Sequence, residues 1–169
     1  MSKRQSLVIG DILSFKGIDK KYKAIICTGI YKDHNPHYYE FAATTYSDEN
    51  KPSLVDIINS KFYGVGNNKS FDYSKLELDN MWKIHPEVKP YYIGSYGFLI
   101  WKKDLRTFYS ELELVGNINI VHNLAQNGNG SVNASSLNFL RDFFAFDSLN
   151  ILLERGQETY QVKSILLGE

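Results

Sequence analysis

The stretch that decides the fold is residues 7–31, LVIGDILSFKGIDKKYKAIICTGIY. Two runs of strand-forming residues, 7–15 and 22–31, flank the turn sequence GIDKK at residues 17–21. Such runs on either side of a short turn that contains glycine are typical of a β-hairpin, and the Gly10-Asp11 pair interrupts the first strand. The chain is therefore predicted to contain an antiparallel hairpin near its start.

The remaining strand patterns are short and closely spaced. They are predicted at residues 37–46, 91–102 and 111–121, with a terminal hairpin over residues 149–167. Three further segments have turn-like or mixed patterns: residues 62–68 are predicted to be a turn, 126–130 a loop, and 104–110 either a helical turn or a strand continuation. Most connections are too short for parallel crossovers, so the strands are expected to pair mainly antiparallel.

Two short helices are expected among these strands. Ser53, followed three residues later by Asp56, matches a helix N-cap signature. A second helix is predicted after Ser135 or Ser136, where apolar residues recur at helical spacing over residues 137–144. These elements predict one α+β domain over residues 1–169, mostly antiparallel β, which forms a small, partly open barrel or a strongly curved sheet with two short helices.

Charge and cysteine content narrow the class of protein. Lys plus Arg equals Asp plus Glu at 19 each, so no net positive field attracts phosphate groups. Another protein is therefore favoured over nucleic acid as the partner, and the oligomeric state is left open. Cys27 is the only cysteine, which excludes an intramolecular disulfide, and its apolar neighbours predict a buried thiol.

The apolar segments are too short for targeting or membrane insertion. The N-terminal apolar stretch is interrupted after three residues, which is too short for the core of a signal peptide. No run approaches the roughly 20 apolar residues that cross a bilayer. The sequence predicts a cytoplasmic protein with no membrane partner.

Aromatic residues are the best candidates for a binding surface. The chain has twelve tyrosines and ten phenylalanines, and adjacent tyrosines on a strand place one ring on each face. Exposed Tyr and Trp often anchor protein interfaces, because they bury a large area at little entropic cost. The candidate binding residues are Tyr38, Tyr39, Tyr91, Tyr92 and Trp101, with packing on strand faces as the alternative.

The chemical motifs in the chain are weak. His34, His37 and Glu40 lie close in sequence, but Pro36 excludes a helix, and on a strand His37 and Glu40 point to opposite faces. No metal site and no cofactor are therefore predicted. Residues 62–68, FYGVGNN, lack the residues of a phosphate-binding loop. Glu111 and Glu113 would share one strand face, as acid–base catalysis requires, but a solvated face explains them equally well.

The first hairpin resembles the opening of the PemK/MazF toxin family. The resemblance is carried by GDIL at residues 10–13, a charged turn, and YKAIICT at residues 22–28. It implies an SH3-like barrel and RNA cleavage, supported in that family by an arginine that opens the second motif and a Ser or Thr that ends it. Here Tyr22 stands in the arginine position, Lys23 in the proline position and Thr28 in the Ser/Thr position.

The missing arginine weakens the catalytic part of this resemblance. A neutral Tyr22 cannot stabilise the charge that develops on a phosphate, and Lys21 or Lys23 would supply only a point charge. The resemblance therefore favours a barrel more than a ribonuclease. Two functions are expected: a non-catalytic protein-binding domain, such as an immunity or antitoxin-like inhibitor of a bacterial toxin, or an endoribonuclease toxin that uses Lys21, Lys23 and Thr28.

Overall fold

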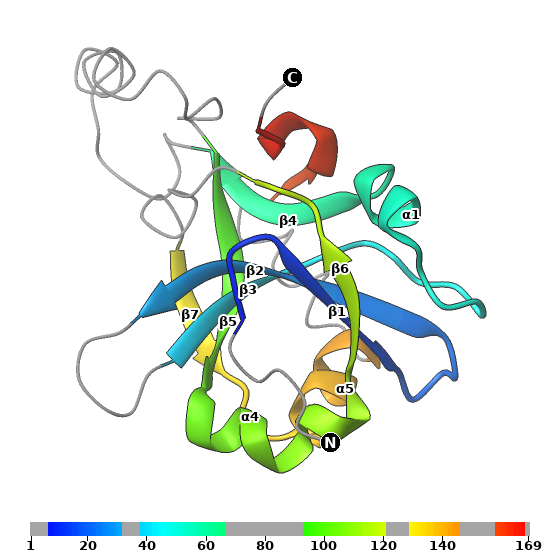
Figure 1. Ribbon diagram of the computed structural model, residues 1–169, viewed down its shortest axis with the longest axis vertical. Helices are drawn as coiled ribbons and strands as arrows, with labels where there is room; N and C mark the ends of the chain where they lie inside the picture. Colours follow the sequence, from blue (N-terminus) through cyan, green and yellow to red (C-terminus); the bar gives the residue numbers. More distant parts are fainter. Residues whose placement is uncertain (1–6, 32–37, 67–92, 121–128, 146–157, 168–169) are drawn as a thin grey trace.

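A strongly curved, eight-stranded sheet forms the centre of the computed structural model, which describes residues 7–31, 38–66, 93–120, 129–145 and 158–167. The strand order is β6-β1-β2-β3-β5-β4-β8, and β7 pairs with β5 (Figure 1). The strands are β1 (Asp11–Lys16), β2 (Tyr22–Tyr31), β3 (Tyr38–Ala43), β4 (Lys61–Gly66), β5 (Ile93–Trp101), β6 (Glu113–Asn117), β7 (Asn129–Asn133) and β8 (Glu158–Gln161).

The predicted first hairpin is confirmed. β1 and β2 pair antiparallel from Ile12↔Ile26 to Lys16↔Tyr22. The turn is closed by the Gly17 amide, which donates to the Lys21 carbonyl at 2.8 Å, and Lys20 takes a positive φ of 67°. β2 then pairs antiparallel with β3, and β3 with β5. The mainly antiparallel α+β fold is thus as predicted, with the parallel pair β5–β7 as the exception.

The sheet curls but does not close into a barrel. Its two end strands, β6 and β8, do not pair with each other within the described residues. The segments that follow them do meet, through one isolated bridge, Ile120↔Leu166, and a 2.9 Å hydrogen bond from the Leu167 amide to the Asn119 carbonyl. The curvature that was predicted is present, and closure is limited to these contacts.

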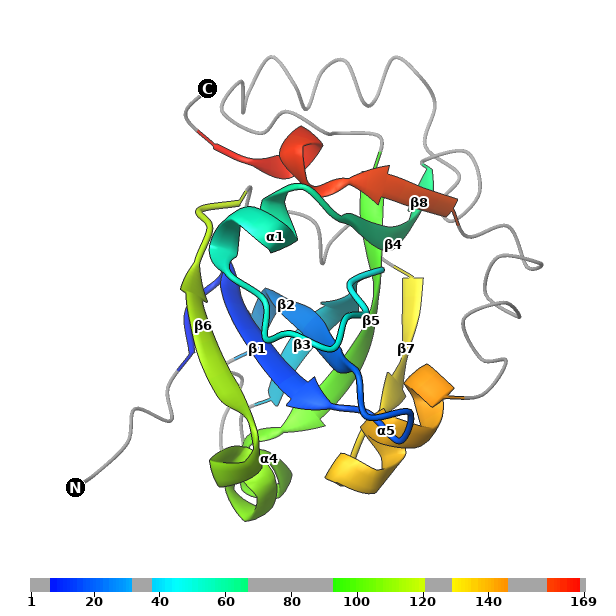
Figure 2. The same ribbon diagram turned by 90° about the vertical axis from the view of Figure 1, so that its right-hand side faces the viewer.

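Both faces of β1, β2 and β3 are covered, which explains why their residues are almost continuously buried. One face packs against helices α4 (Lys102–Phe108) and α5 (Leu137–Ala145), and we call this cluster the α4–α5 core. The opposite face packs against α1 (Leu54–Ile58), β4 and the 3₁₀ helix η2 (Val162–Ile165), and we call this the α1 core. Figure 2 shows the two groups on opposite sides of β1, β2 and β3.

The helices are positioned by local capping as well as by packing. At α1 the Asp56 amide donates to Ser53 Oγ at 3.2 Å, and the Ser53 amide donates to the Asp56 carboxylate at 3.0 Å. This capping box confirms the predicted start of α1. At α5 the Phe139 amide donates to Ser136 Oγ at 3.1 Å, which selects Ser136 from the two predicted caps.

A glycine allows α1 to lie against β6. Gly116 has a φ of +151°, and a Cβ atom at this position would come within 2.9 Å of Leu54 Cδ1. Any other residue would therefore be strained in its backbone, and its Cβ would force the Leu54 side chain to move. Gly116 is thus a site of close packing between β6 and α1.

Several local predictions were wrong. Residues 61–66 form β4 instead of a turn, because pairing with both β5 and β8 stabilises a segment whose own glycine-rich pattern is weak. Residues 129–133 likewise form β7 on β5. Of the two alternatives predicted for residues 104–110, the helical turn is confirmed and the strand continuation was wrong. Three α-helices are described instead of two. Glu111 ends the 3₁₀ helix η1 (Tyr109–Glu111), so it does not share a strand face with Glu113.

The predicted terminal hairpin is only partly described. Residues 149–157 lie outside the described residues, while β8 pairs with β4 and is followed by η2 in place of a longer strand. In the described ranges, no helix has the length and apolar character needed to cross a membrane.

Candidate functional site

Two of the predicted binding residues meet at the end of β3 and β5. Tyr38 and Trp101 are directly opposite each other in the antiparallel register, and their ring centroids lie 4.9 Å apart at an interplanar angle of 48°. Cross-strand neighbours on one face of a sheet are close enough for such a contact. Both side chains are half-buried, so each ring packs against the fold and still presents surface to solvent.

A hollow of about 390 Å³ lies beside this aromatic pair. It is lined by Trp101, Lys103, Asp104, Asn133 and Ser135. The first three come from the junction of β5 and α4, while Asn133 ends β7 and Ser135 lies between β7 and α5. The parallel pairing of Leu99 with Asn133 brings the two segments together.

Tyr39, another of the predicted binding residues, does not join this pair. Tyr39 is only 4% exposed and belongs to the α4–α5 core, since it points to the opposite face of β3 from Tyr38. Tyr91 and Tyr92 lie outside the described residues. The candidate site is therefore formed by Tyr38, Trp101 and the hollow beside them.

The residues proposed for RNA cleavage are spread along β2 and its preceding turn. Lys23 and Thr28 are five positions apart on a strand that rises about 3.3 Å per residue, which separates their backbones by about 16 Å. Thr28 is fully buried, and its hydroxyl donates to the Glu40 carbonyl at 3.4 Å. Lys21 is exposed in the turn. The three residues are therefore not brought together around one substrate position.

Lys23 has a structural role that its position in sequence did not reveal. Its side chain is 6% exposed, and its ammonium group lies 2.9 Å from Asp19 and 2.8 Å from Ser47 Oγ. The hydrogen bond from Lys23, followed by one from the Lys21 amide, lowers the pKa of Asp19. Together these bonds join the β1–β2 turn to the segment that follows β3.

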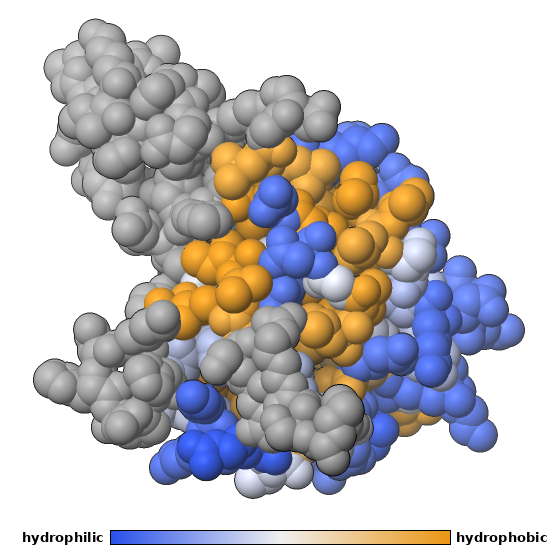
Figure 3. All heavy atoms as spheres, in the orientation of Figure 1, coloured by the Kyte–Doolittle hydropathy of each residue, from blue (hydrophilic) through white to orange (hydrophobic). Residues whose placement is uncertain are grey.

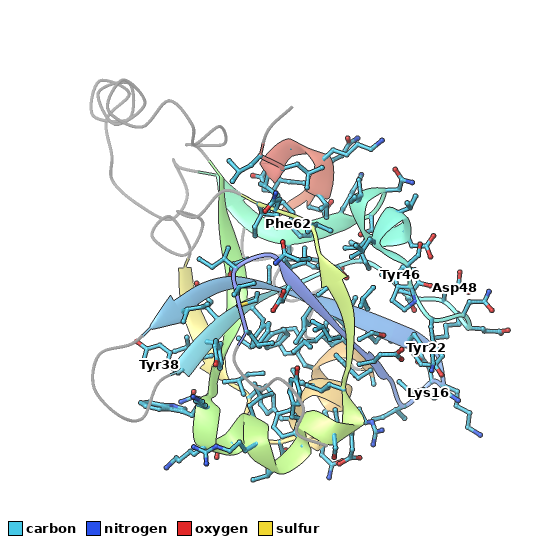
Figure 4. The ribbon with its side chains drawn as sticks, in the orientation of Figure 1. Lys16, Tyr22, Tyr38, Tyr46, Asp48 and Phe62 are labelled. Carbon is cyan, nitrogen blue, oxygen red and sulfur yellow. The ribbon has the colours of Figure 1, made fainter. Side chains whose placement is uncertain are left out.

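This end of the hairpin is also held by Tyr22. Its backbone bridges to Asp48, and the Lys16 ammonium group lies 5.7 Å from the centre of the Tyr22 ring. Figure 4 shows Lys16, Tyr22 and Asp48 at the opposite end of the hairpin from Tyr38. The turn end of the hairpin is thus well separated from the candidate site at Tyr38 and Trp101.

Cys27 is an inert core thiol, as its apolar neighbours predicted. It is fully buried, and burial, with a smaller contribution from the charge of Asp11, raises its pKa from 9.0 to about 12. A thiol with this pKa carries almost no thiolate at neutral pH and cannot act as a nucleophile. Glu40 is also buried, whereas His34 and His37 lie outside the described residues. No group of three or more potential metal ligands gathers in the described part of the chain.

A second surface is apolar but has no defined site. On the face in Figure 3, hydrophobic side chains gather near α1 and β6 and are interrupted by polar groups. The large apolar residues that remain exposed include Val55 at 64%, Val8 at 52% and Leu114 at 36%. These are separate aliphatic side chains from different elements, so they indicate a binding site less clearly than the paired rings do.

Tyr38 and Trp101 were candidates from the sequence, but neither their contact nor the polar lining of the hollow could be predicted from it. Asn133 and Ser135 lie more than thirty positions from Trp101, and no local motif connects them. Their proximity depends on the parallel β5–β7 pairing and on the Ala134 amide, which donates to the Leu99 carbonyl at 2.8 Å.

Comparison of the chain with protein-family models, with curated proteins and with solved structures finds no match. The site is therefore interpreted from the geometry of this chain alone.

Proposed function

We propose that this chain is a non-catalytic protein-binding domain, of the kind that inhibits a bacterial toxin by occluding it. The observation that carries the proposal is the half-buried Tyr38–Trp101 pair beside the hollow. Large aromatic side chains held in place by the fold lose little entropy on binding and bury much area, which is typical of interface hot spots. The equal numbers of acidic and basic residues also favour a protein partner over a polyanion.

The polar groups of β2 support the same proposal, because they are engaged in the fold. Thr28 is buried, Lys23 is bound to Asp19 and Ser47, and Cys27 is protonated. We place the domain in the cytoplasm as part of the proposal, since its one cysteine is a buried free thiol. The SH3-like barrel also remains a proposal, supported by the contacts near Ile120 and Leu166 that partly close the sheet.

Co-purification with the products of neighbouring genes tests the function. The wild-type chain is expected to retain a specific partner, and Trp101→Ala and Tyr38→Ala should each reduce its retention at least about tenfold, because hot-spot truncations cost 2 kcal/mol or more. Tyr22→Ala is the matched control, since it removes a half-buried ring at the opposite end of the hairpin. Equal retention by all three folded variants would contradict the proposed site.

Expression of the chain alone tests the ribonuclease alternative. Under the binding proposal, cells should grow normally and their RNA should remain intact. Growth arrest with RNA cleavage that depends on Lys21 and Thr28 would instead establish the endoribonuclease. Lys21→Ala is the informative variant here, because Lys21 is exposed, whereas Lys23→Ala would also disturb the fold.

A further inference from the structure

The hollow beside Trp101 contains polar side chains that the fold does not use. Across the described residues, no hydrogen bond or ion pair engages the side chains of Lys103, Asp104, Asn133 or Ser135. The contact at Asp104 is made by its backbone carbonyl, which accepts the Thr107 hydroxyl at 2.6 Å. These groups are therefore available to a ligand.

Asp104 supplies the strongest hydrogen-bond acceptor in this lining. An ionised Asp104 carboxylate only accepts hydrogen bonds, and the Asn133 amide and Ser135 hydroxyl can each offer an acceptor oxygen. Lys103 and the indole N–H of Trp101 can only donate, whereas Asp104 is the one charged acceptor in the lining. A ligand that pairs with Asp104 must therefore supply a donor, and a charged donor makes the stronger bond.

The aromatic wall favours a cation. The face of an indole ring attracts positive charge and repels negative charge, and Trp101 is the ring type for which this attraction is strongest. Its contact with Tyr38 at 4.9 Å restricts the ring orientation before any ligand binds. A cation can pair with the Asp104 carboxylate and also contact the Trp101 ring, so the occupant expected is a cation.

Among the cationic side chains, arginine fits this combination best. A guanidinium group is planar, stacks on an aromatic face, and donates two parallel hydrogen bonds to a carboxylate while keeping further donors for other acceptors. Lys103 is exposed on a flexible stem, so its ammonium group can extend into water and leave Asp104 unpaired. We infer that the hollow binds an arginine side chain of the partner protein, stacked on Trp101 and paired with Asp104.

This inference rests on the proposed function and names the chemical group that the site recognises. It is tested with the full chain carrying Trp82→Phe, which leaves Trp101 as the only tryptophan. The probes are capped Gly-X-Gly tripeptides in which X is arginine, lysine, tyrosine or citrulline, the last being an uncharged analogue of arginine. Binding is followed by Trp101 fluorescence and by the NMR signal of its indole N–H.

The arginine peptide should bind saturably and about tenfold more tightly than the citrulline peptide, because charge-assisted hydrogen bonds are about twice as strong as neutral ones. Asp104→Asn should weaken arginine binding by a similar factor, while Lys103→Gln should leave it unchanged or strengthen it. Binding of citrulline or tyrosine as strong as that of arginine, or no saturable binding of any peptide, would overturn the inference.

Partner retention separates the two proposals. If Trp101→Ala abolishes retention of the partner and Asp104→Asn does not, the binding function stands and the arginine assignment is wrong. If the peptides bind as expected but neither variant alters retention, the hollow recognises arginine and the proposed function of the site fails.

Discussion

The two ends of the β1–β2–β3 meander both carry charged and aromatic residues, yet the structure uses them differently. At the turn end, Lys23 is bonded to Asp19 and Ser47, and Tyr22 lies against Lys16. At the other end, Tyr38 stacks on Trp101, but the neighbouring polar side chains of the hollow make no bonds within the described part of the chain. Polar residues at the first end stabilise the fold, and those at the second are available for binding.

Lys23→Ala should have the largest effect on stability. The substitution removes two hydrogen bonds from a nearly buried ammonium group, and one such charged bond contributes about 2 kcal/mol. We expect the free energy of unfolding, measured by urea denaturation, to fall by about this amount. Lys21→Ala is the control, because Lys21 is exposed and should change stability by less than about 0.5 kcal/mol. If both variants lowered the free energy of unfolding equally, the structural role assigned to Lys23 would be wrong.

Alkaline pH should produce the next largest effect, through Cys27. Burial raises its pKa to about 12 in the folded chain, whereas the unfolded thiol titrates near 9. Above pH 9 the unfolded state loses a proton that the folded state keeps, so the free energy of unfolding decreases as pH rises, by up to about 1.4 kcal/mol per pH unit.

Urea denaturation at pH 8, 9 and 10 measures this contribution when Cys27→Ala is compared with the wild type. Above pH 9 the free energy of unfolding of the wild type should fall relative to that of the variant. The buried tyrosines, whose pKa values are also raised, are present in both chains and cancel from this comparison. A constant difference across this range would mean that the folded thiol ionises normally, and Cys27 would then not be inert.

The contrast between the two ends also shows what could be inferred from the sequence. The hairpin, the N-cap at Ser53 and the buried Cys27 follow from residues that are close together, and the structure confirms them. β4 and β7 were missed because their glycine-rich sequences become strands only when distant partners supply the hydrogen bonds. The bonds of Lys23 to Ser47 and the lining of the hollow also depend on long-range pairing, so sequence spacing could not indicate which polar groups are engaged.

Substitutions in the hollow should have the smallest effect on stability. The side chains of Asp104 and Lys103 make no hydrogen bonds or ion pairs in the described part of the fold. Asp104→Asn and Lys103→Gln therefore remove no such interaction from the folded state. We expect each to change the free energy of unfolding by less than about 0.5 kcal/mol, as for most surface substitutions away from specific contacts. A loss near that of Lys23→Ala would mean that Asp104 supports the fold, and the distinction between the two ends would fail. A small change in stability, combined with a large change in arginine binding, would assign Asp104 to recognition, because a residue that only supports the fold could not produce that combination.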